Sequence, residues 1–244
     1  MERVMDLEEQ TNFLIEMTSP APIHPDLEPH ITTGPMGRML HHPYVIDIMY
    51  HPTMNKRLNK LYEYKNKSID EAISEEKWAR FVFLHERPYR LDALVSIIRD
   101  YGETRQDVIL PLLADVWTDS ENIYQNFKTW TELWRGKWSS QPLDRTFVLS
   151  EADNAAFKAL PDRLTIYRGW VKHKGSIGSH GLSWTLNRDK AVWFAKRFQS
   201  DKPAFLSTME IDKQNILAYF TQRNEDEVVV LRKHILEVKS EQIL

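Results

Sequence analysis

The pattern of apolar residues changes near residue 150, and this change limits the fold more than any other feature. From there on, the apolar runs are short and rich in β-branched and aromatic residues, which is typical of strands. We expect strands at 164–171, 181–186, 204–211, 215–220, 227–231 and 234–238. One amphipathic helix interrupts them at 186–200, with Asn187 as its N-cap. This order favours an α+β fold with an antiparallel or mixed sheet over a doubly wound parallel sheet.

The preceding 149 residues have a different pattern. The Pro-rich opening at 19–35 predicts an irregular segment. Helical patterns follow it at 69–87, 90–102, 109–117 and 121–138, and Gly102 is a plausible C-cap for the second of these. The sequence therefore predicts a mainly helical N-terminal region, 1–149, that packs on a core formed by residues 150–244.

Four aromatic residues recur at helical spacing within the segment 121–138. They are Phe127, Trp130, Trp134 and Trp138. A stripe of this kind needs a partner surface, so we expect it to form the core of a helical subdomain. The alternative is that these rings stack on a nucleic acid base or on nicotinamide.

Composition excludes several classes of protein. A chain of 244 residues with 42% hydrophobic residues can bury a substantial core, and no segment approaches the roughly 20 apolar residues of a membrane-spanning helix. The opening MERVMDLEEQ lacks the features of a signal peptide, so we expect a cytoplasmic protein. The absence of cysteine excludes disulfides, thiolate nucleophiles and Cys-ligated zinc.

Charge is distributed unevenly along the chain. Residues 151–244 hold 15 Lys and Arg against 12 Asp and Glu, a balance of +3, whereas residues 1–150 hold 17 against 23, a balance of −6. The C-terminal part can therefore accommodate an anionic ligand, but neither part has the strongly basic character of a typical nucleic-acid-binding protein. The histidines of the first part have spacings that match no familiar metal site, and we expect no metal: His24, His30, His41, His42 and His51.

Three short motifs follow one another in the strand-rich part. They are Tyr167-Arg168-Gly169 on the first strand, Ser183-Trp184-Thr185 on the second, and Glu225-Asp226-Glu227 before a later one. The set resembles the arginine-serine-glutamate class of ADP-ribosyltransferases, the cholera-toxin-like enzymes with a Glu-x-Glu motif. The resemblance covers roughly residues 150 to 240 and implies a split β-sandwich with NAD as co-substrate. Without the other two motifs, the Glu-x-Glu segment would be interpreted as a solvated turn that protects a strand edge.

The resemblance also implies roles for the motif residues. Glu227 would stabilise the oxocarbenium-like ribose and hold its 2′-hydroxyl. Glu225 would lie on the same side of an extended segment and accept a proton from the attacking group, while Asp226 points elsewhere. Arg168 would bind the pyrophosphate or the adjoining ribose, and Ser183 would hold Glu227 in place.

Further residues near the motifs are candidates for contact with NAD. The full predicted cofactor-binding set is Tyr167, Arg168, Gly169, Ser183, Trp184, Thr185, Phe194 and Glu227. Tyr167, Trp193 and Phe194 are candidates to stack on nicotinamide, with ordinary packing between sheet and helix as the favoured alternative. The loop with Gly175, Gly178 and Gly181 either lies beside a phosphate or is a mobile connection between two strands. Trp184 departs from the Ser-Thr-Ser often found in the family, although its side chain should face the opposite side of the sheet.

The resemblance implies that the turn before the catalytic strand contacts the acceptor, which makes Phe220, Gln222 and Arg223 the substrate-facing candidates. A Glu at position 225 implies a protein arginine as acceptor, and hence a mono-ADP-ribosyltransferase. The alternatives are transfer to a base of RNA or single-stranded DNA, an NAD glycohydrolase, and a non-catalytic protein-binding module. Bacterial and phage-encoded effectors resemble this arrangement, so a toxin or an antiphage protein with an inhibitory protein partner would fit.

Overall fold

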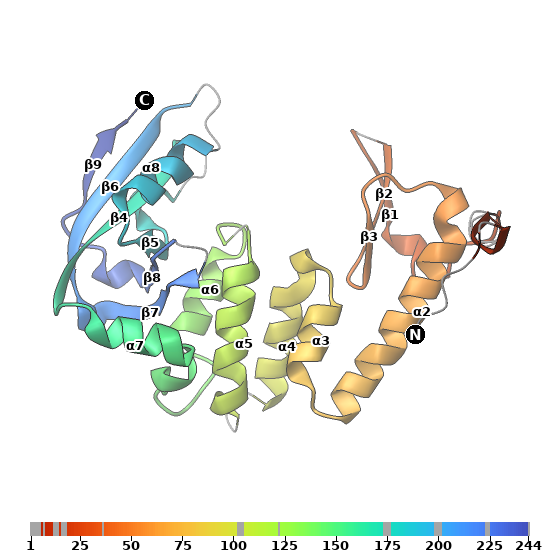
Figure 1. The fold of residues 1–244 in the computed structure, drawn as a ribbon, viewed down its shortest axis with the longest axis horizontal. Coiled ribbons are helices and arrows are strands. Elements are labelled where there is room, and N and C mark those ends of the chain that lie inside the picture. Colours follow the sequence, from red (N-terminus) through yellow and green to blue (C-terminus); the bar gives the residue numbers. More distant parts are fainter. Residues whose placement is uncertain are drawn as a thin grey trace. The chain divides into compact units, whose positions relative to one another are not determined.

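The computed structural model describes residues 6, 8–11, 15, 19–35, 37–101, 105–121, 123–172, 177–197, 202–222 and 225–243. The chain forms two compact units, Met1–Ile97 and Ile98–Leu244, which we call the N-terminal and the C-terminal unit (Figure 1). This division differs from the predicted boundary between 149 and 150. The change in apolar pattern near residue 150 therefore lies inside the C-terminal unit, which contains both helices and the sheet.

The N-terminal unit combines a small antiparallel sheet with helices. Its elements are η1 (Glu28–His30), β1 (Ile31–Gly34), β2 (Gly37–His42), β3 (Val45–Asp47), η2 (Pro52–Met54), α2 (Asn55–Ser74), α3 (Trp78–Leu84) and η3 (Arg87–Tyr89), followed by the start of α4 (Arg90–Tyr101). The side chains of Leu27, Leu40 and Val45 are fully buried, and they pack with Tyr50, Leu58 and Tyr62 of this unit.

Two expectations for this unit are corrected by the structure. The segment 19–35 is not irregular throughout, because Ile31–Gly34 pairs with β2 and thereby satisfies its backbone groups. The pattern at 69–87 is divided between two helices, α2 and α3, and Glu76 lies between them with a φ of 52°. The expected C-cap Gly102 lies outside the described residues.

The C-terminal unit has several helices before its sheet, and the first two of them share an aromatic core. These helices are α5 (Gln106–Asp119), α6 (Phe127–Trp134), η4 (Arg145–Phe147) and α7 (Glu151–Ala159). The ring of Trp117 lies edge-on to Trp130 and Trp134, with ring centroids 5.0 and 5.4 Å apart. All three side chains are buried, which confirms that the tryptophans at the centre of the predicted stripe form a helical core.

A six-stranded sheet follows these helices. It consists of β4 (Arg163–Val171), β5 (Ser183–Thr185), β6 (Ala204–Asp212), β7 (Ile216–Phe220), β8 (Glu227–Val230) and β9 (Lys239–Gln242). The strand order is β7-β8-β5-β4-β6-β9, and every pairing among the described strands is antiparallel. The prediction of an α+β fold is confirmed. The shorter elements between the strands are η5 (Gly178–His180), η6 (Lys213–Asn215) and η8 (Arg232–His234).

Two local expectations for the strand region have different outcomes. Helix α8 (Arg188–Arg197) begins after Asn187, whose Oδ1 accepts a hydrogen bond from the Lys190 amide at 3.1 Å, so the expected N-cap is confirmed. The strand expected at 234–238 is wrong, because η8 and an irregular segment occupy this region and the strand β9 begins only at Lys239.

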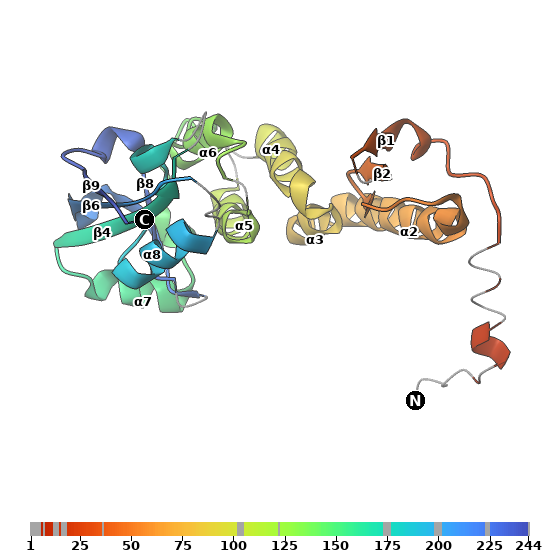
Figure 2. The same cartoon turned by 90° about the horizontal axis from the view of Figure 1, so that it is seen from above.

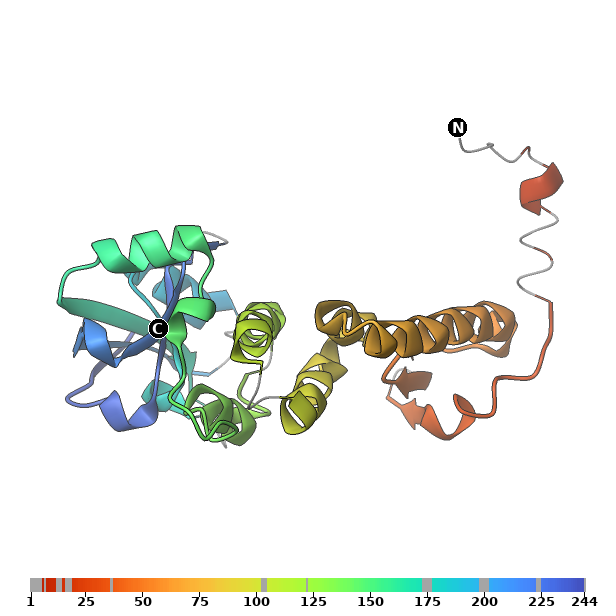
Figure 3. The ribbon, with the colours of Figure 1, turned by 90° about the horizontal axis from the view of Figure 1, so that it is seen from below.

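The middle of the sheet has the fewest paired residues between neighbouring strands. Strand β4 pairs with β6 along its whole length, yet it pairs with β5 only through Tyr167 and Thr185. Helix α7 packs on the sheet face that carries Ile166 (Figure 3). Helix α8 lies against the other face at Gly169 (Figure 2), where a Cβ would overlap the backbone carbonyl of Ala191. Among the described residues no other pair joins β4 to β5, and both strands line the pocket described below.

Candidate active site

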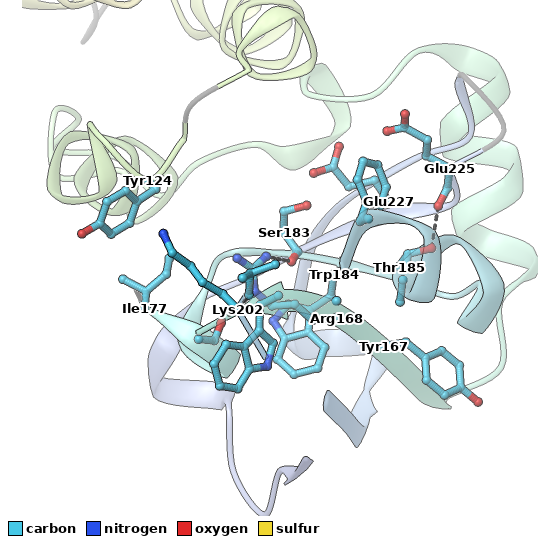
Figure 4. Close-up of a pocket in the computed structure, with 16 residues that line it drawn as sticks. Tyr124, Tyr167, Arg168, Ile177, Ser183, Trp184, Thr185, Lys202, Glu225 and Glu227 are labelled. Atoms are coloured by element: carbon cyan, nitrogen blue, oxygen red, sulfur yellow. Dashed lines mark hydrogen bonds between the residues drawn. The ribbon is translucent and has the colours of Figure 1, made fainter. Parts of the chain in front are cut away.

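A pocket of about 450 Å³ lies in the C-terminal unit, within the size range of small-molecule sites (Figure 4). Its walls come from β4, β5, α8, the start of β8 and the loop around Gly178. The structure brings into this one pocket the predicted residues Tyr167, Arg168, Gly169, Ser183, Trp184, Thr185, Phe194, Glu225 and Glu227.

Glu227 is the first residue of β8 and lies opposite Thr185 of β5. Its Oε1 accepts a hydrogen bond from the indole Nε1 of Trp117 at 3.2 Å. The pKa of Glu227 is raised to about 7, mainly by burial and in addition by the nearby Glu225, and this is the net result after the opposing effects of Ser183, Trp117 and the charge of Arg168. The carboxyl group is therefore close to its titration midpoint at neutral pH, as is typical of catalytic acids and bases.

Arg168 connects the two halves of the sheet. Its Nε donates to the carbonyl of Gly178 at 3.0 Å, and its Nη1 donates to the carbonyl of Ser183 at 2.5 Å. Burial lowers the pKa of Arg168 to about 10, while the Glu227 carboxylate opposes this shift. The guanidinium group therefore remains charged at neutral pH, and it fixes the loop around Gly178 to the strand that carries Ser183.

The turn before β8 brings both carboxylates to the pocket, but its backbone conformation differs from the expected extended segment. Asp226 has a φ of 47°, so residues 225–227 are not a simple extended segment. The hydroxyl of Thr185 donates to the Glu225 carbonyl at 2.5 Å, and the Tyr219 hydroxyl donates to Oδ1 of Asp226 at 3.0 Å. These bonds anchor the turn. Glu225 and Glu227 face the pocket, and Asp226 points elsewhere, as expected.

Three residues close to the pocket mainly serve packing. The side chain of Trp184 lies in the core cluster on the Ile166 face, and its indole donates to the Gly181 carbonyl at 2.9 Å. Gly169 allows the backbone of α8 to approach β4 closely. Trp193 is half exposed and packs against Phe194 rather than lining the pocket.

The substrate-facing candidates are not in this pocket. Phe220 is buried, and together with the exposed Gln222 it lines a second cavity of about 370 Å³ beside Asp115 and Asp153. Arg223 lies outside the described residues. Among the described residues of the turn, those that face the first pocket are the carboxylates.

The other sequence candidates lie at different places. Gly181 lies against the Arg168 side chain, Gly178 lies against the Trp170 ring and accepts a hydrogen bond from Arg168 through its carbonyl, and Gly175 falls outside the described residues. His30 and His42 contact each other edge-on in the N-terminal unit. No group of three or more His, Asp or Glu in the described ranges is arranged to hold a metal ion. Within the same ranges, no helix has the length and apolar character needed to cross a membrane.

Several residues of the site were not predicted, among them Trp117, Tyr124 and Lys202. Trp117 bonds Glu227 across 110 positions of sequence, and Tyr124 lines the pocket from the segment between α5 and α6. The sequence pattern indicated the helices but not their proximity to the motif strands. Comparisons of this chain with protein-family models, with curated proteins and with solved structures find no match.

Proposed function

We propose that this chain is an NAD-dependent mono-ADP-ribosyltransferase that releases nicotinamide and transfers ADP-ribose to a macromolecule, with a protein arginine as the preferred acceptor. The observation that carries the proposal is the meeting of Arg168, Ser183 and Glu227 in one pocket. They come from three different strands, and the carboxyl group of Glu227 has a pKa of about 7.

The donor set fits a dinucleotide. Two guanidinium N–H groups of Arg168 bond carbonyls, and within the described part of the chain its Nη2 makes no hydrogen bond, so this nitrogen is available for a phosphate or ribose oxygen. Lys202 adds a second cation at the pocket wall. NAD, when bound, supplies a glycosidic bond whose electron pair departs with nicotinamide.

The two carboxylates have separate roles in the proposed reaction. Glu227 in its ionised form stabilises the positive charge that develops on the ribose as the bond to nicotinamide breaks. Glu225 takes the proton that the acceptor nitrogen loses as it bonds the ribose carbon. Because Glu227 must be ionised, nicotinamide release should increase as the pH rises through about 7.

The first test measures nicotinamide release from NAD by the purified protein and by Glu227→Gln. We expect the variant to lose activity by a factor of about 10² to 10³, because it lacks the charge that stabilises the transition state. Glu210→Gln is the control, since Glu210 is an exposed carboxylate on β6 that pairs with Arg163. Equal rates for Glu227→Gln and wild type, or no release by wild type with cell extract as the acceptor source, would contradict the proposal.

A second variant separates transfer from cleavage. Glu225→Gln should lose transfer of label from NAD to macromolecules more strongly than nicotinamide release, because it removes the proton acceptor and keeps Glu227. Protease-sensitive label in a lysate supports a protein acceptor. Nuclease-sensitive label would replace it with a nucleic acid base, and free ADP-ribose alone would indicate an NAD glycohydrolase.

A further inference from the structure

We propose that Trp117 is a positioning residue that holds the Glu227 carboxylate in a single orientation toward the ribose. The inference rests on the proposed function, and it concerns a residue outside all three sequence motifs. Trp117 lies in the last turn of α5, in a segment that the resemblance to ADP-ribosyltransferases does not cover.

The first support is the contact itself. The Trp117 indole Nε1 donates to Oε1 of Glu227 at 3.2 Å, and the Trp117 side chain is only 1% exposed. A hydrogen bond to an ionised acceptor is stronger than one between neutral groups, and a buried bond has less competition from water. Trp117 therefore restricts the rotation of the carboxylate.

The second support is the rigidity of the donor. The Trp117 ring is nearly perpendicular to both Trp130 and Trp134, with interplanar angles of 90° and 86°. The indole cannot turn unless two other buried rings move, so the position of its N–H is fixed by the packing of α5 and α6.

The third support is that the carboxylate is held from two elements. Ser183 of β5 also interacts with the Glu227 carboxyl group and lowers its pKa, and Trp117 approaches from a helix. Contacts from two separate elements restrict a carboxylate more closely than a single contact can. The Trp117 hydrogen bond also favours the ionised form of Glu227 and lowers its pKa. Loss of the indole N–H should therefore move the pH profile of the reaction upward.

Packing alone does not account for this bond. Trp134 belongs to the same aromatic cluster, and its indole Nε1 has no hydrogen-bond partner among the described residues. The cluster thus accommodates a buried indole N–H that bonds nothing. This difference provides a matched pair of variants, Trp117→Phe and Trp134→Phe, in which the same group is removed from neighbouring rings.

The experiment compares kcat, KM for NAD and the pH profile of nicotinamide release in the two variants. Trp117→Phe should lower kcat at pH 7 by about tenfold or more with little change in KM, and should shift the midpoint of the profile to higher pH. Trp134→Phe should keep the wild-type midpoint. Equal effects of the two variants would overturn the positioning role.

A third variant removes the effect of a smaller ring. Benzothienylalanine at position 117 has nearly the shape of tryptophan but carries sulfur in place of the N–H, so it keeps the packing and loses the bond. It should reproduce the lower kcat and the shifted pH midpoint of Trp117→Phe. Wild-type kcat and midpoint with this residue would refute the inference.

An NMR titration distinguishes failure of this inference from failure of the proposed function. The indole N–H resonance of Trp117 should shift as Glu227 titrates in the wild type, and the shift should be absent in Glu227→Gln. A resonance that does not follow Glu227 overturns the positioning role, even if nicotinamide is released. A resonance that does follow it, in a protein that releases no nicotinamide, overturns the proposed function and with it the catalytic role of Trp117.

Discussion

Each unit of this protein buries a cluster of ionisable groups, and the two clusters differ in what surrounds them. In the N-terminal unit, burial lowers the pKa of His42 to about 4 and also lowers the pKa of His85. In the C-terminal unit, burial raises the pKa of Glu227 to about 7 and lowers that of Arg168 to about 10. By the size of the pKa shifts alone, the clusters are alike.

Their surroundings are not alike. The ring of His42 lies edge-on to His30, Tyr44 and Tyr62, and the Tyr62 hydroxyl donates to Asp26 at 2.6 Å, so these side chains contact one another. Glu227 and Arg168 line a pocket of about 450 Å³. A perturbed pKa therefore records burial, and it indicates a functional site only where the group also faces space for a ligand.

The largest effect expected on stability concerns Arg168. Arg168→Met leaves the carbonyls of Gly178 and Ser183 without their donor and removes the cation near Glu227, so we expect a loss of about 3 to 5 kcal/mol in the free energy of unfolding. Urea denaturation measures it. Arg163→Met on the same strand is the control, because its ion pair with Glu210 is exposed and contributes at most about 1 kcal/mol. Equal losses in the two variants would mean that the buried hydrogen bonds of Arg168 stabilise the fold no more than an exposed ion pair does.

The next effect concerns the cluster of the N-terminal unit, in which the side chains around His42 contact one another. The pKa of His42 is lower in the folded state than the ordinary 6.5, so its contribution to stability is present above pH 6.5 and is lost as the pH falls toward 4. We expect the N-terminal unit to lose up to about 3 kcal/mol across this range. His42→Asn keeps an acceptor for the Tyr44 amide and should reduce the loss.

NMR signals of β2 amides in a urea series between pH 4 and 7 measure this loss. The exposed His51, whose Nδ1 accepts from the Thr53 amide, provides the control His51→Asn. The same pH dependence in wild type and His42→Asn would mean that the cluster does not sense protonation.

The smallest effect concerns the cluster of the C-terminal unit, in which Glu227 faces the pocket. The pKa of Glu227 is higher in the folded state than the ordinary 4.5, so its contribution to stability is present below pH 4.5 and is lost as the pH rises through about 7. Glu227→Gln should therefore be more stable than wild type at pH 8, by about 1 to 3 kcal/mol, since Glu227 is partly exposed to the pocket. The difference should vanish below pH 4.5 in thermal or urea unfolding. A difference that does not change with pH would mean that the carboxylate carries no cost of burial.

Much of the C-terminal unit could be predicted from sequence because its signals are local. The β-branched runs at 164–171 and 227–231 form β4 and β8, and Asn187 caps α8, since strand and cap preferences depend on neighbouring residues. The β1–β3 sheet was missed because its strands are only 4, 6 and 3 residues long and are stabilised by pairing with one another. The substrate-facing candidates came from a resemblance and not from packing, and the structure places Phe220 and Gln222 at another cavity.

The sequence alone determined which residue types are present for chemistry: an arginine, a hydroxyl and a pair of carboxylates on segments with strand character. Only the tertiary structure decided that they meet in one pocket, that β4 and β5 are joined through the single pair of Tyr167 and Thr185, and that Trp117 reaches Glu227 from 110 residues away. The reason is physical. Preferences for helix, strand and cap act over a few residues, whereas burial, pKa and the approach of a distant donor depend on how whole faces pack together.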